Sequence, residues 1–449
     1  MKTELEKKYG LATAICMVVG IVIGSGVFFK AETVLIRTGG DMFTGIIAWC
    51  VVGFIMIVCS NVFATLANRY EKVNGLVDYA EATLGKRYAY NIGWFMATLY
   101  TPALVAVLAW VCARYTCSLI GWDVTGGACM TIAATYMCTS YALNALAPRL
   151  AGKFQVSTTV IKMIPLALMA LMGTFVGMTS GSFASSLTQS TSAIPFSEGL
   201  TGAIVSIAFA CEGWILATSI NAELKDAKRN LPLALMFGSL IVAATYLLYY
   251  IGINGVVSPQ ELMANGENGV RIAFQRLFGE NAGTIVFVLI VISCMGTLNG
   301  LTMANTRGFY ALAARGNGPN PELFKQIDPV TNMPTNSATI SILLAAIWLL
   351  YFYGAALGGG WFGKFCFDSS ELPIITIYGM YIPMFISIIL RSKDLSIFNR
   401  IIMPSLAIVG SLGMILAAII AYGFTTVFYY MIVYVIIMVI GNILYETKK

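Results

Sequence analysis

The chain has 449 residues, of which 58% are hydrophobic and 11% charged, and its formal net charge is +6. Because an ordinary soluble domain carries about a quarter charged residues, this composition and a mean hydropathy of +0.80 exclude one. At about 20 to 30 residues per crossing, the chain has room for about ten to fourteen membrane helices, so residues 1–449 are expected to form one integral membrane domain.

Twelve apolar segments separated by polar turns are predicted to cross the membrane. They fall near residues 11–36, 42–67, 90–119, 126–147, 151–179, 199–223, 231–257, 282–314, 335–356, 366–391, 402–423 and 425–446. The first runs on from a short charged N-terminus, MKTELEKKYG, in which we expect no cleaved signal. The fold class is therefore all-α and polytopic.

Lysine and arginine predict the orientation, because cytoplasmic loops keep an excess of positive charge. The two tails and the even-numbered connections hold twenty of the twenty-seven basic residues. Both termini are therefore expected in the cytoplasm, with the chain in the inner (plasma) membrane. The positive charge then reflects topology, and no nucleic-acid partner is expected.

The first predicted span contains GIVIGSGVFF, in which Gly24, Ser25 and Gly26 stand about 20 Å along the helix, at mid-membrane. One interpretation is close helix packing, since Gly20 and Gly24 form a small-xxx-small pair. The other is an unwound segment, which survives at that depth only where it lines an enclosed cavity. The sixth span has a comparable interruption at 208–213, and interruptions at matching positions of two halves are typical of transporters whose substrate lies between broken helices.

The chemistry of such a break suits an α-amino acid. Free N–H groups at the start of the outer half-helix, from Val27 onward, favour a carboxylate. Unpaired carbonyls at the end of the inner half, around Val22, favour an ammonium group.

Four motifs in this order carry a resemblance to a known family. They are GSGVF at 24–28, FQVSTTVIKMIPL at 154–166, FACEGW at 209–214 with ELKDAKRNLP at 223–232, and ALAARGNGP at 311–319. Over nearly its whole length the chain resembles the amino acid–polyamine–organocation superfamily, and within it the L-type amino acid transporters and bacterial serine/threonine exchangers.

The resemblance implies the leucine-transporter fold, with broken helices 1 and 6, inverted repeats at about 11–179 and 199–391, and peripheral helices at 402–446. It also implies that the substrate carboxylate meets the amides of Ser25 and Gly26, and that the ammonium meets carbonyls near Val22 and Phe209. The Phe209 ring would close over the substrate. Many relatives have tryptophan there, and Cys211 stands where the exchangers often have tyrosine, so the preferred side chain stays open.

Two buried ionisable residues are candidates for function. Lys162 lies eleven residues into the fifth span, too deep to reach the interface with ease. In the relatives a lysine here reaches the broken first helix, where sodium-coupled members bind an ion; proton coupling also stays open. Glu212 could be structural, which we favour, or could counter a cationic substrate.

Other polar residues have weaker signals. Tyr100 and Asn299 could line the pocket or serve helix packing. Asp368 and Glu371, in FDSSELP, could form an outer vestibule or a solvated helix start, and the second is slightly preferred.

An enzyme is not expected. The chain has no histidine, no metal-ligand cluster, no GxSxG and no nucleotide-binding glycine motif. The ten cysteines lie mostly in apolar runs without a CxxC array, so neither a disulfide framework nor a metal or other cofactor is expected.

The sequence thus predicts a sodium-independent exchanger of small to medium neutral L-amino acids that works by alternating access. The alternative is a proton-coupled or antiport carrier of cationic amino acids or amines. The L-type relatives of animals join a single-span partner through a cysteine in the loop between helices three and four. Because that loop, GWDVTGG, has none here, no ancillary subunit is expected.

Overall fold

The computed structural model describes residues 5–24, 26–70, 74–183, 194–266 and 268–446. Over these residues the chain is helical, and an isolated bridge joins Tyr9 and Leu224. The α-helices are α1 Leu11–Val22, α2 Gly26–Arg37, α3 Met42–Arg69, α4 Gly75–Leu84, α5 Lys86–Phe95, α6 Thr101–Ile120, α7 Gly127–Leu146, α8 Pro148–Leu168, α9 Thr174–Thr179, α11 Phe196–Ala210, α12 Ala227–Val256, α13 Pro259–Asn265, α14 Asn268–Phe278, α15 Glu280–Asn305, α16 Gly308–Ala313, α17 Pro321–Phe324, α18 Thr335–Phe352, α19 Glu371–Arg391, α20 Met403–Tyr422 and α21 Phe424–Glu446.

Eleven helical segments of the described chain are long and apolar enough to cross a membrane. They are Leu11–Arg37, Met42–Arg69, Lys86–Ile120, Pro148–Thr179, Phe196–Glu223, Ala227–Val256, Glu280–Ala313, Thr335–Leu357, Glu371–Arg391, Phe398–Tyr422 and Phe424–Tyr445. The remaining predicted span, 126–147, is α7, a 20-residue helix that is less apolar than these eleven.

Several spans combine an α-helix with a tighter or wider turn. α5 and α6 are joined by the π-helical turn Met96–Tyr100, and α8 and α9 by the π-helical turn Met169–Gly173. α11 is followed by η3, a 3₁₀ helix at Trp214–Glu223. The end of α11 and the start of η3 place the interruption of the sixth span within the predicted residues 208–213.

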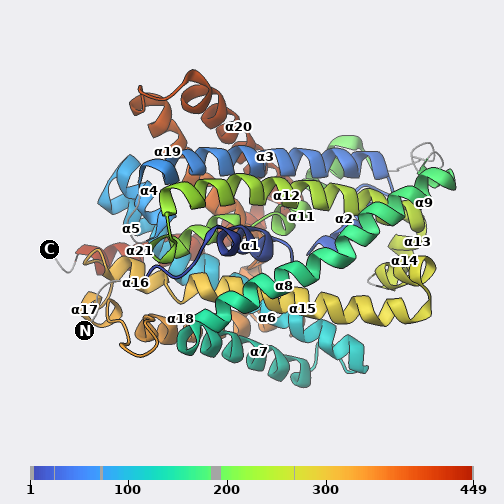
Figure 1. Ribbon diagram of the computed structural model, residues 1–449, viewed down its shortest axis with the longest axis horizontal. Helices are drawn as coiled ribbons and strands as arrows, with labels where there is room; N and C mark the ends of the chain where they lie inside the picture. Colours follow the sequence, from blue (N-terminus) through green and yellow to red (C-terminus); the bar gives the residue numbers. More distant parts are fainter. Residues whose placement is uncertain (1–4, 25, 71–73, 184–193, 267, 447–449) are drawn as a thin grey trace.

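The long helices run side by side along the longest axis of the molecule, and both ends of the chain lie at the same end of the bundle (Figure 1). We call this the terminal end, and the opposite end, where α9, α13 and α14 lie, the far end. A shared end for the two termini is what an even number of crossings produces.

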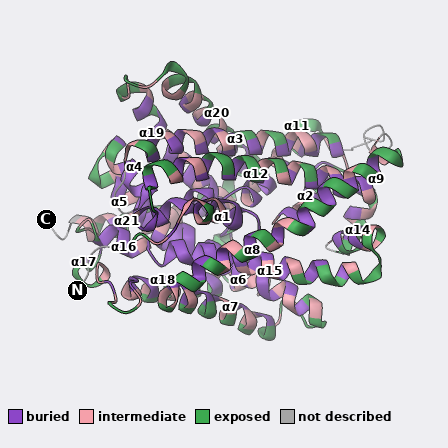
Figure 2. Cartoon of the chain, in the orientation of Figure 1, coloured by how far each residue is buried: buried purple, intermediate pink, exposed green. Residues whose placement is uncertain are grey.

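Burial separates a core from a periphery (Figure 2). In the most apolar stretches of Lys86–Ile120 and Phe196–Glu223, 89% of the residues are buried, against 11% in Phe424–Tyr445. The two former spans therefore lie at the centre of the bundle. The last span presents most of its surface outward, and its apolar composition suits contact with lipid.

Candidate functional site

Two interrupted helices meet at the centre of the bundle. α1 ends at Val22 and α2 begins at Gly26. α11 ends at Ala210, and Gly213 then turns the chain into η3 with a φ of +98°. A Cβ on Gly213 would lie 2.6 Å from Ile21 Cγ2. Glycine is therefore required here both by the backbone conformation and by the closeness of the two breaks.

Tyr246 of α12 joins the two breaks. Its hydroxyl lies 2.8 Å from the Val22 carbonyl oxygen and 3.0 Å from that of Ala210, and the side chain is fully buried. Carbonyls at the end of a helix have no partner within the helix. One phenol thus provides a hydrogen bond at the end of both half-helices, with its single proton shared between two acceptors.

A cavity of about 30 Å³ lies between the breaks, with room for about one water molecule. It is lined by Ile21, Val22, Gly24, Gly26, Leu104, Leu108, Phe209, Ala210, Glu212, Gly213, Thr297 and Leu301. Five of the predicted site residues are therefore brought together here. Cys211 is buried beside the cavity but does not line it, and Ser25 lies outside the described residues.

Lys162 of α8 reaches the break in the first span. Its fully buried ammonium donates to the carbonyl oxygens of Gly20, at 2.9 Å, and Ile23, and lies 3.2 Å from Thr297 Oγ1. Thr297 Oγ1 is itself 3.0 Å from each of the two carbonyl oxygens. All three ammonium protons therefore have an acceptor, and the Lys162 side chain joins α8 to the two carbonyls at the end of α1 and to Thr297 of α15.

Glu212 lies directly after the end of α11 and is buried. Its Oε1 accepts a hydrogen bond of 2.5 Å from the Tyr100 hydroxyl. Its Oε2 is also buried and makes no hydrogen bond of normal length among the described residues, although the Gly213 N–H and the Tyr378 hydroxyl lie near the carboxyl group. A carboxyl group with one unpaired oxygen beside a central cavity is an uncommon arrangement, because buried polar atoms are usually satisfied. Tyr100 thus reaches the site through Glu212 and does not line the cavity itself.

Asn299 does not line this cavity, and of the two roles left open for it, the contacts below are those of helix packing. Its side chain donates to Gln155 Oε1 at 2.8 Å and to the Ala151 carbonyl at 3.2 Å, and it accepts from Asn144 at 3.1 Å. It therefore joins α15 to α8 and α7. The reason is helical geometry: Asn299 follows Thr297 by two residues, which turns it about 200° away from the cavity.

Two functional candidates were missed from the sequence. Thr297 stands in an apolar helix beside the more conspicuous Asn299, and Tyr246 is one of several tyrosines in a hydrophobic run, ATYLLYYIG. Nothing local distinguishes either residue. Their importance comes only from the partners that the packing of α12 and α15 against α1 provides.

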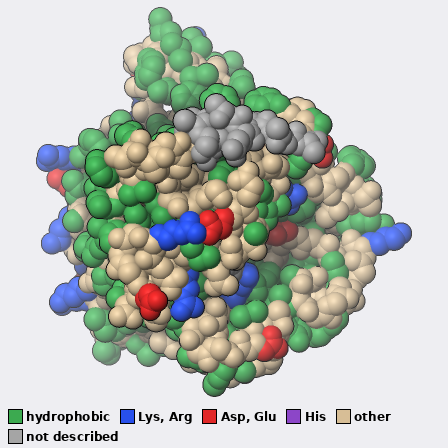
Figure 3. All heavy atoms as spheres, turned by 90° about the vertical axis from the view of Figure 1, so that its right-hand side faces the viewer, with side chains coloured by type: hydrophobic (Ala, Val, Ile, Leu, Met, Phe, Trp, Pro, Cys, Tyr) green, Lys and Arg blue, Asp and Glu red, His purple; other side chains and the backbone are tan. Residues whose placement is uncertain are grey.

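A wider vestibule of about 470 Å³ opens on the far-end side of the cavity. Gly26 and Phe209 line both spaces, so the Phe209 ring stands between them. Lys30 lies 5.2 Å from the centre of that ring and 3.1 Å from Glu371 of α19, whose other oxygen accepts from Tyr422. Figure 3 shows the far-end face of the molecule, where basic and acidic side chains lie side by side near the middle.

Asp368 and Glu371 have different roles at the start of α19. Asp368 Oδ1 accepts from the backbone N–H groups of Ser370 and Glu371, at 2.7 and 2.8 Å, and so caps the helix. Glu371 pairs with Lys30 across the vestibule. Both residues line the vestibule, and Asp368 in addition organises the start of α19.

The terminal end is closed by a buried ionic cluster. Glu223, at the end of η3, contacts both Arg307 and Lys8, the latter at 2.5 Å. The backbone N–H groups of Lys8 and Tyr9 donate to the Glu223 carbonyl at 2.8 and 3.0 Å. Burial lowers the pKa of Lys8, and the nearby Glu223 carboxylate opposes that shift. The segment before α1 is thus fastened across the end of η3.

Comparisons with known proteins agree with this architecture. A model of the family described as amino acid permease matches residues 9–441. The serine/threonine exchanger SteT of Bacillus subtilis (strain 168) is 29% identical over 426 residues, which cover 92% of this chain and 91% of that protein. The b(0,+)-type amino acid transporter 1 of Mus musculus is 26% identical over 428 residues, covering 93% and 84%.

Among solved structures, the crystal structure of MhsT in complex with L-phenylalanine matches with a TM-score of 0.61 at 13% identity. The match covers 93% of this chain and 99% of that one. This likeness shows the fold, and the expected all-α leucine-transporter architecture is confirmed.

Proposed function

The chain belongs to the amino acid permease family, and from this premise we propose that it exchanges small to medium neutral L-amino acids by alternating access, without sodium. The observation that carries the proposal is the meeting of two broken helices at one central cavity. Such a site offers the N-terminus of one half-helix to a carboxylate.

The substrate's two charged groups would then have separate partners. We assign the carboxylate to the backbone N–H groups at Ser25 and Gly26, where the dipole of α2 is positive. The Val22 carbonyl already accepts from Tyr246 and from the Gly24 N–H. The Phe209 carbonyl accepts a longer hydrogen bond, of 3.4 Å, from the Glu212 N–H. We therefore assign the ammonium to the Phe209 carbonyl and the free oxygen of Glu212 together with the Val22 carbonyl.

Lys162 supports independence from sodium. Its ammonium lies between the α1 carbonyls and Thr297, and we infer that it takes the place there of a cation that those oxygens could otherwise coordinate. Since the charge is covalently attached, we assign Lys162 the role of a substitute for a coupling ion.

Two closures support alternating access. The far-end closure is the Phe209 ring with the Lys30–Glu371 pair, and the terminal-end closure is the Lys8–Glu223–Arg307 cluster. A cavity of about 30 Å³ cannot hold an amino acid, so one closure must open to load the site. The small side chain we propose fits the apolar wall of Leu104, Leu108 and Leu301.

The alternative is a carrier of cationic amino acids or amines, by antiport or with protons. Its specific support is Glu212, because a buried carboxyl group with an unpaired oxygen could pair with a second positive charge. A neutral substrate would leave that oxygen to the α-ammonium alone.

The remaining parts of the proposal concern placement. We propose a location in the cell's inner (plasma) membrane with both termini in the cytoplasm, so that the terminal end is the cytoplasmic end. The repeats would span about 11–179 and 199–391, with 402–446 peripheral. The transporter would work without an ancillary single-span subunit, and no catalytic activity is assigned to it.

Counterflow in proteoliposomes tests the function. Vesicles are loaded with one unlabelled amino acid, and uptake of trace labelled substrate is compared in sodium, in choline and under imposed pH gradients. We expect internal serine, threonine or another neutral amino acid to drive uptake equally in sodium and choline. Uptake driven only by cationic amino acids or amines would establish the alternative, and dependence on sodium would contradict the role of Lys162.

A further inference from the structure

The terminal half of the sixth span is an unusually long 3₁₀ helix. This helix, η3, has ten residues, Trp214–Glu223. Runs of 3₁₀ helix longer than three or four residues are uncommon, because their hydrogen bonds have poorer geometry than those of an α-helix. Nothing in the sequence WILATSINAE forbids an α-helix, since it contains neither proline nor glycine. The packing around η3 therefore decides its form.

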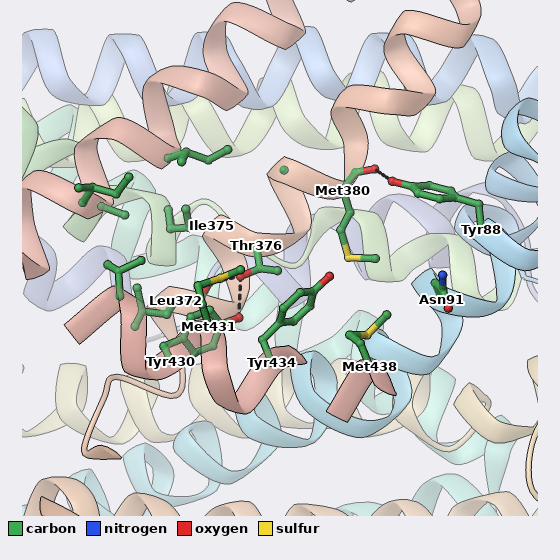
Figure 4. Close-up of a pocket in the computed structure, with 15 residues that line it drawn as sticks. Tyr88, Asn91, Leu372, Ile375, Thr376, Met380, Tyr430, Met431, Tyr434 and Met438 are labelled. Carbon is green, nitrogen blue, oxygen red and sulfur yellow. Dashed lines mark hydrogen bonds between the residues drawn. The ribbon is translucent and has the colours of Figure 1, made fainter. Parts of the chain in front are cut away.

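The start of η3 is fixed against the body of the bundle. The Trp214 ring lies 6.3 Å from that of Tyr381 on α19. α19 is in turn tied to its neighbours, as Figure 4 shows: the Tyr88 hydroxyl of α5 donates to an α19 carbonyl at 2.6 Å, and Thr376 shares a hydrogen bond of 2.6 Å with Tyr430 of α21. The first residue of η3 thus packs against a wall that is itself held on two sides.

The end of η3 is fixed by the buried ionic cluster. The Glu223 carboxylate pairs with Arg307 and Lys8, and the Glu223 carbonyl accepts from the N–H groups of Lys8 and Tyr9. The Lys225 N–H completes this attachment by donating to the Tyr9 carbonyl at 2.9 Å. η3 is therefore held at both ends, at a separation that a 3₁₀ helix spans.

An α-helix of the same residues would not reach the cluster. Nine steps separate Trp214 from Glu223. At about 2.0 Å per step a 3₁₀ helix covers about 18 Å, whereas an α-helix at about 1.5 Å covers about 13.5 Å. Each step also turns by about 120° in the first and about 100° in the second. Conversion would thus withdraw Glu223 by about 4.5 Å and turn it about half a turn away.

Two polar groups of η3 are left without hydrogen bonds in the present form. Ser219 Oγ and Asn221 Nδ2 are buried and have no partner among the described residues. Because buried polar atoms are usually satisfied, such groups favour a second conformation in which water or protein reaches them. Conversion to an α-helix turns both side chains relative to the start of η3, by about 100° for Ser219 and about 140° for Asn221.

We propose that η3 converts from a 3₁₀ helix to an α-helix when the terminal end opens, and that this conversion withdraws Glu223 from Arg307 and Lys8. The inference rests on the proposed function, because alternating access requires the terminal end to open. In the closed form the ionic cluster keeps η3 extended. In the open form the helix gains the better hydrogen bonds of an α-helix, which offset part of the loss of the ion pairs.

A cysteine scan of residues 214–222 tests the change of helix type. Each position is replaced singly by cysteine in the full chain, with and without Glu223→Gln, which removes the ion pairs at constant size. The protein in nanodiscs is exposed to a charged methanethiosulfonate reagent, and mass spectrometry locates each adduct, so the native cysteines do not interfere. Because these residues are buried, except for the partly buried Ala222, labelling should be slow without Glu223→Gln and about tenfold faster with it.

The spacing of the fast positions identifies the helix. Positions seven apart, such as Ile215 and Ala222, share a side of an α-helix to within about 20°. Positions six apart, such as Ile215 and Asn221, share a side of a 3₁₀ helix. We expect the labelling rates in Glu223→Gln to repeat every seven residues. A repeat of six would show that η3 moves without changing its form and would overturn the proposal, as would labelling that stays slow.

A second variant releases η3 and leaves the ionic residues in place. Thr218 Oγ1 donates to the Ile215 carbonyl at 2.7 Å and accepts from the Leu76 N–H of α4 at 3.2 Å, so Thr218→Ala frees the middle of η3. It should produce the same seven-residue repeat, which covers the case in which Glu223→Gln folds poorly. The matched controls are Thr201→Ala and Glu198→Gln on α11, two exposed positions of the same span, which should leave labelling slow.

The labelling and the transport assay fail separately. Labelling needs no transported substrate, so a chain that exchanges no amino acid but shows the seven-residue repeat would contradict the proposed function alone. A chain that exchanges neutral amino acids with a six-residue repeat would contradict the conversion of η3 alone.

Discussion

Replacement of Lys162 by methionine is the sharpest test of the proposed site. Methionine has a similar length, and an apolar residue of similar size in place of a buried charge is usually compatible with folding. The substitution removes donors from the Gly20 and Ile23 carbonyls and from Thr297. A hydrogen bond to a charged group contributes about 1.5 to 3 kcal/mol, while Thr297 remains beside both carbonyls.

We therefore expect a net loss of about 3 kcal/mol from the geometry of the break, and transport slowed roughly a hundredfold. The assay is the rate of counterflow in proteoliposomes, with thermal unfolding of the purified protein as the check on folding. Lys153→Met is the matched control, because Lys153 is an exposed lysine on the same helix and should exchange normally. Counterflow of Lys162→Met at close to the wild-type rate would refute the reasoning.

Three further variants probe the two breaks and the far-end closure. Tyr246→Phe removes the hydroxyl that bonds the carbonyls of both breaks. It should lower the exchange rate about tenfold, which corresponds to about 1.4 kcal/mol. Tyr249→Phe is the control and should change the rate little, because the Tyr249 hydroxyl has no partner among the described residues. Gly26→Val should abolish substrate binding, because even a Cβ at Gly26 would lie 3.2 Å from the Ala210 Cβ of the neighbouring break. The control, Gly413→Val, places its side chain in open space and should bind substrate normally. Equal binding by both variants in a scintillation proximity assay would contradict the site. Glu371→Gln weakens a partly exposed ion pair of about 1 kcal/mol and should raise the half-saturating substrate concentration about fivefold, and an unchanged value would remove Glu371 from the closure.

The local pattern of apolar residues was sufficient to predict the membrane helices. About 20 consecutive apolar residues predict a membrane span, and this prediction does not depend on which helices pack against it. The eleven crossing segments follow the predicted ranges closely, and only α7 is less apolar than expected because its sequence mixes threonine, serine and asparagine into the span. The break in the first span was also visible, since Gly24 and Gly26 are poor helix formers at a depth where lipid demands a complete helix.

The contacts of the site could not be predicted in the same way. The sequence left Asn299 open between the cavity and helix packing, and it did not single out Thr297. Thr297 lines the cavity and Asn299 does not, because a difference of two positions turns a side chain to the other side of the helix. The pairing of Lys30 with Glu371 joins residues 341 positions apart, and the use of Tyr246 by both breaks joins α12 to two other spans.

The sequence by itself thus determined that the chain is a helical membrane protein with interrupted helices, and its motifs indicated the family that the comparisons then established. Those properties reside in runs of neighbouring residues, which the bilayer and the backbone constrain directly. Only the tertiary structure decided which carbonyls Lys162 reaches, that one oxygen of Glu212 makes no hydrogen bond of normal length, and that Glu371 pairs with Lys30. These depend on how distant helices pack, and a shift of one residue in that packing replaces every partner.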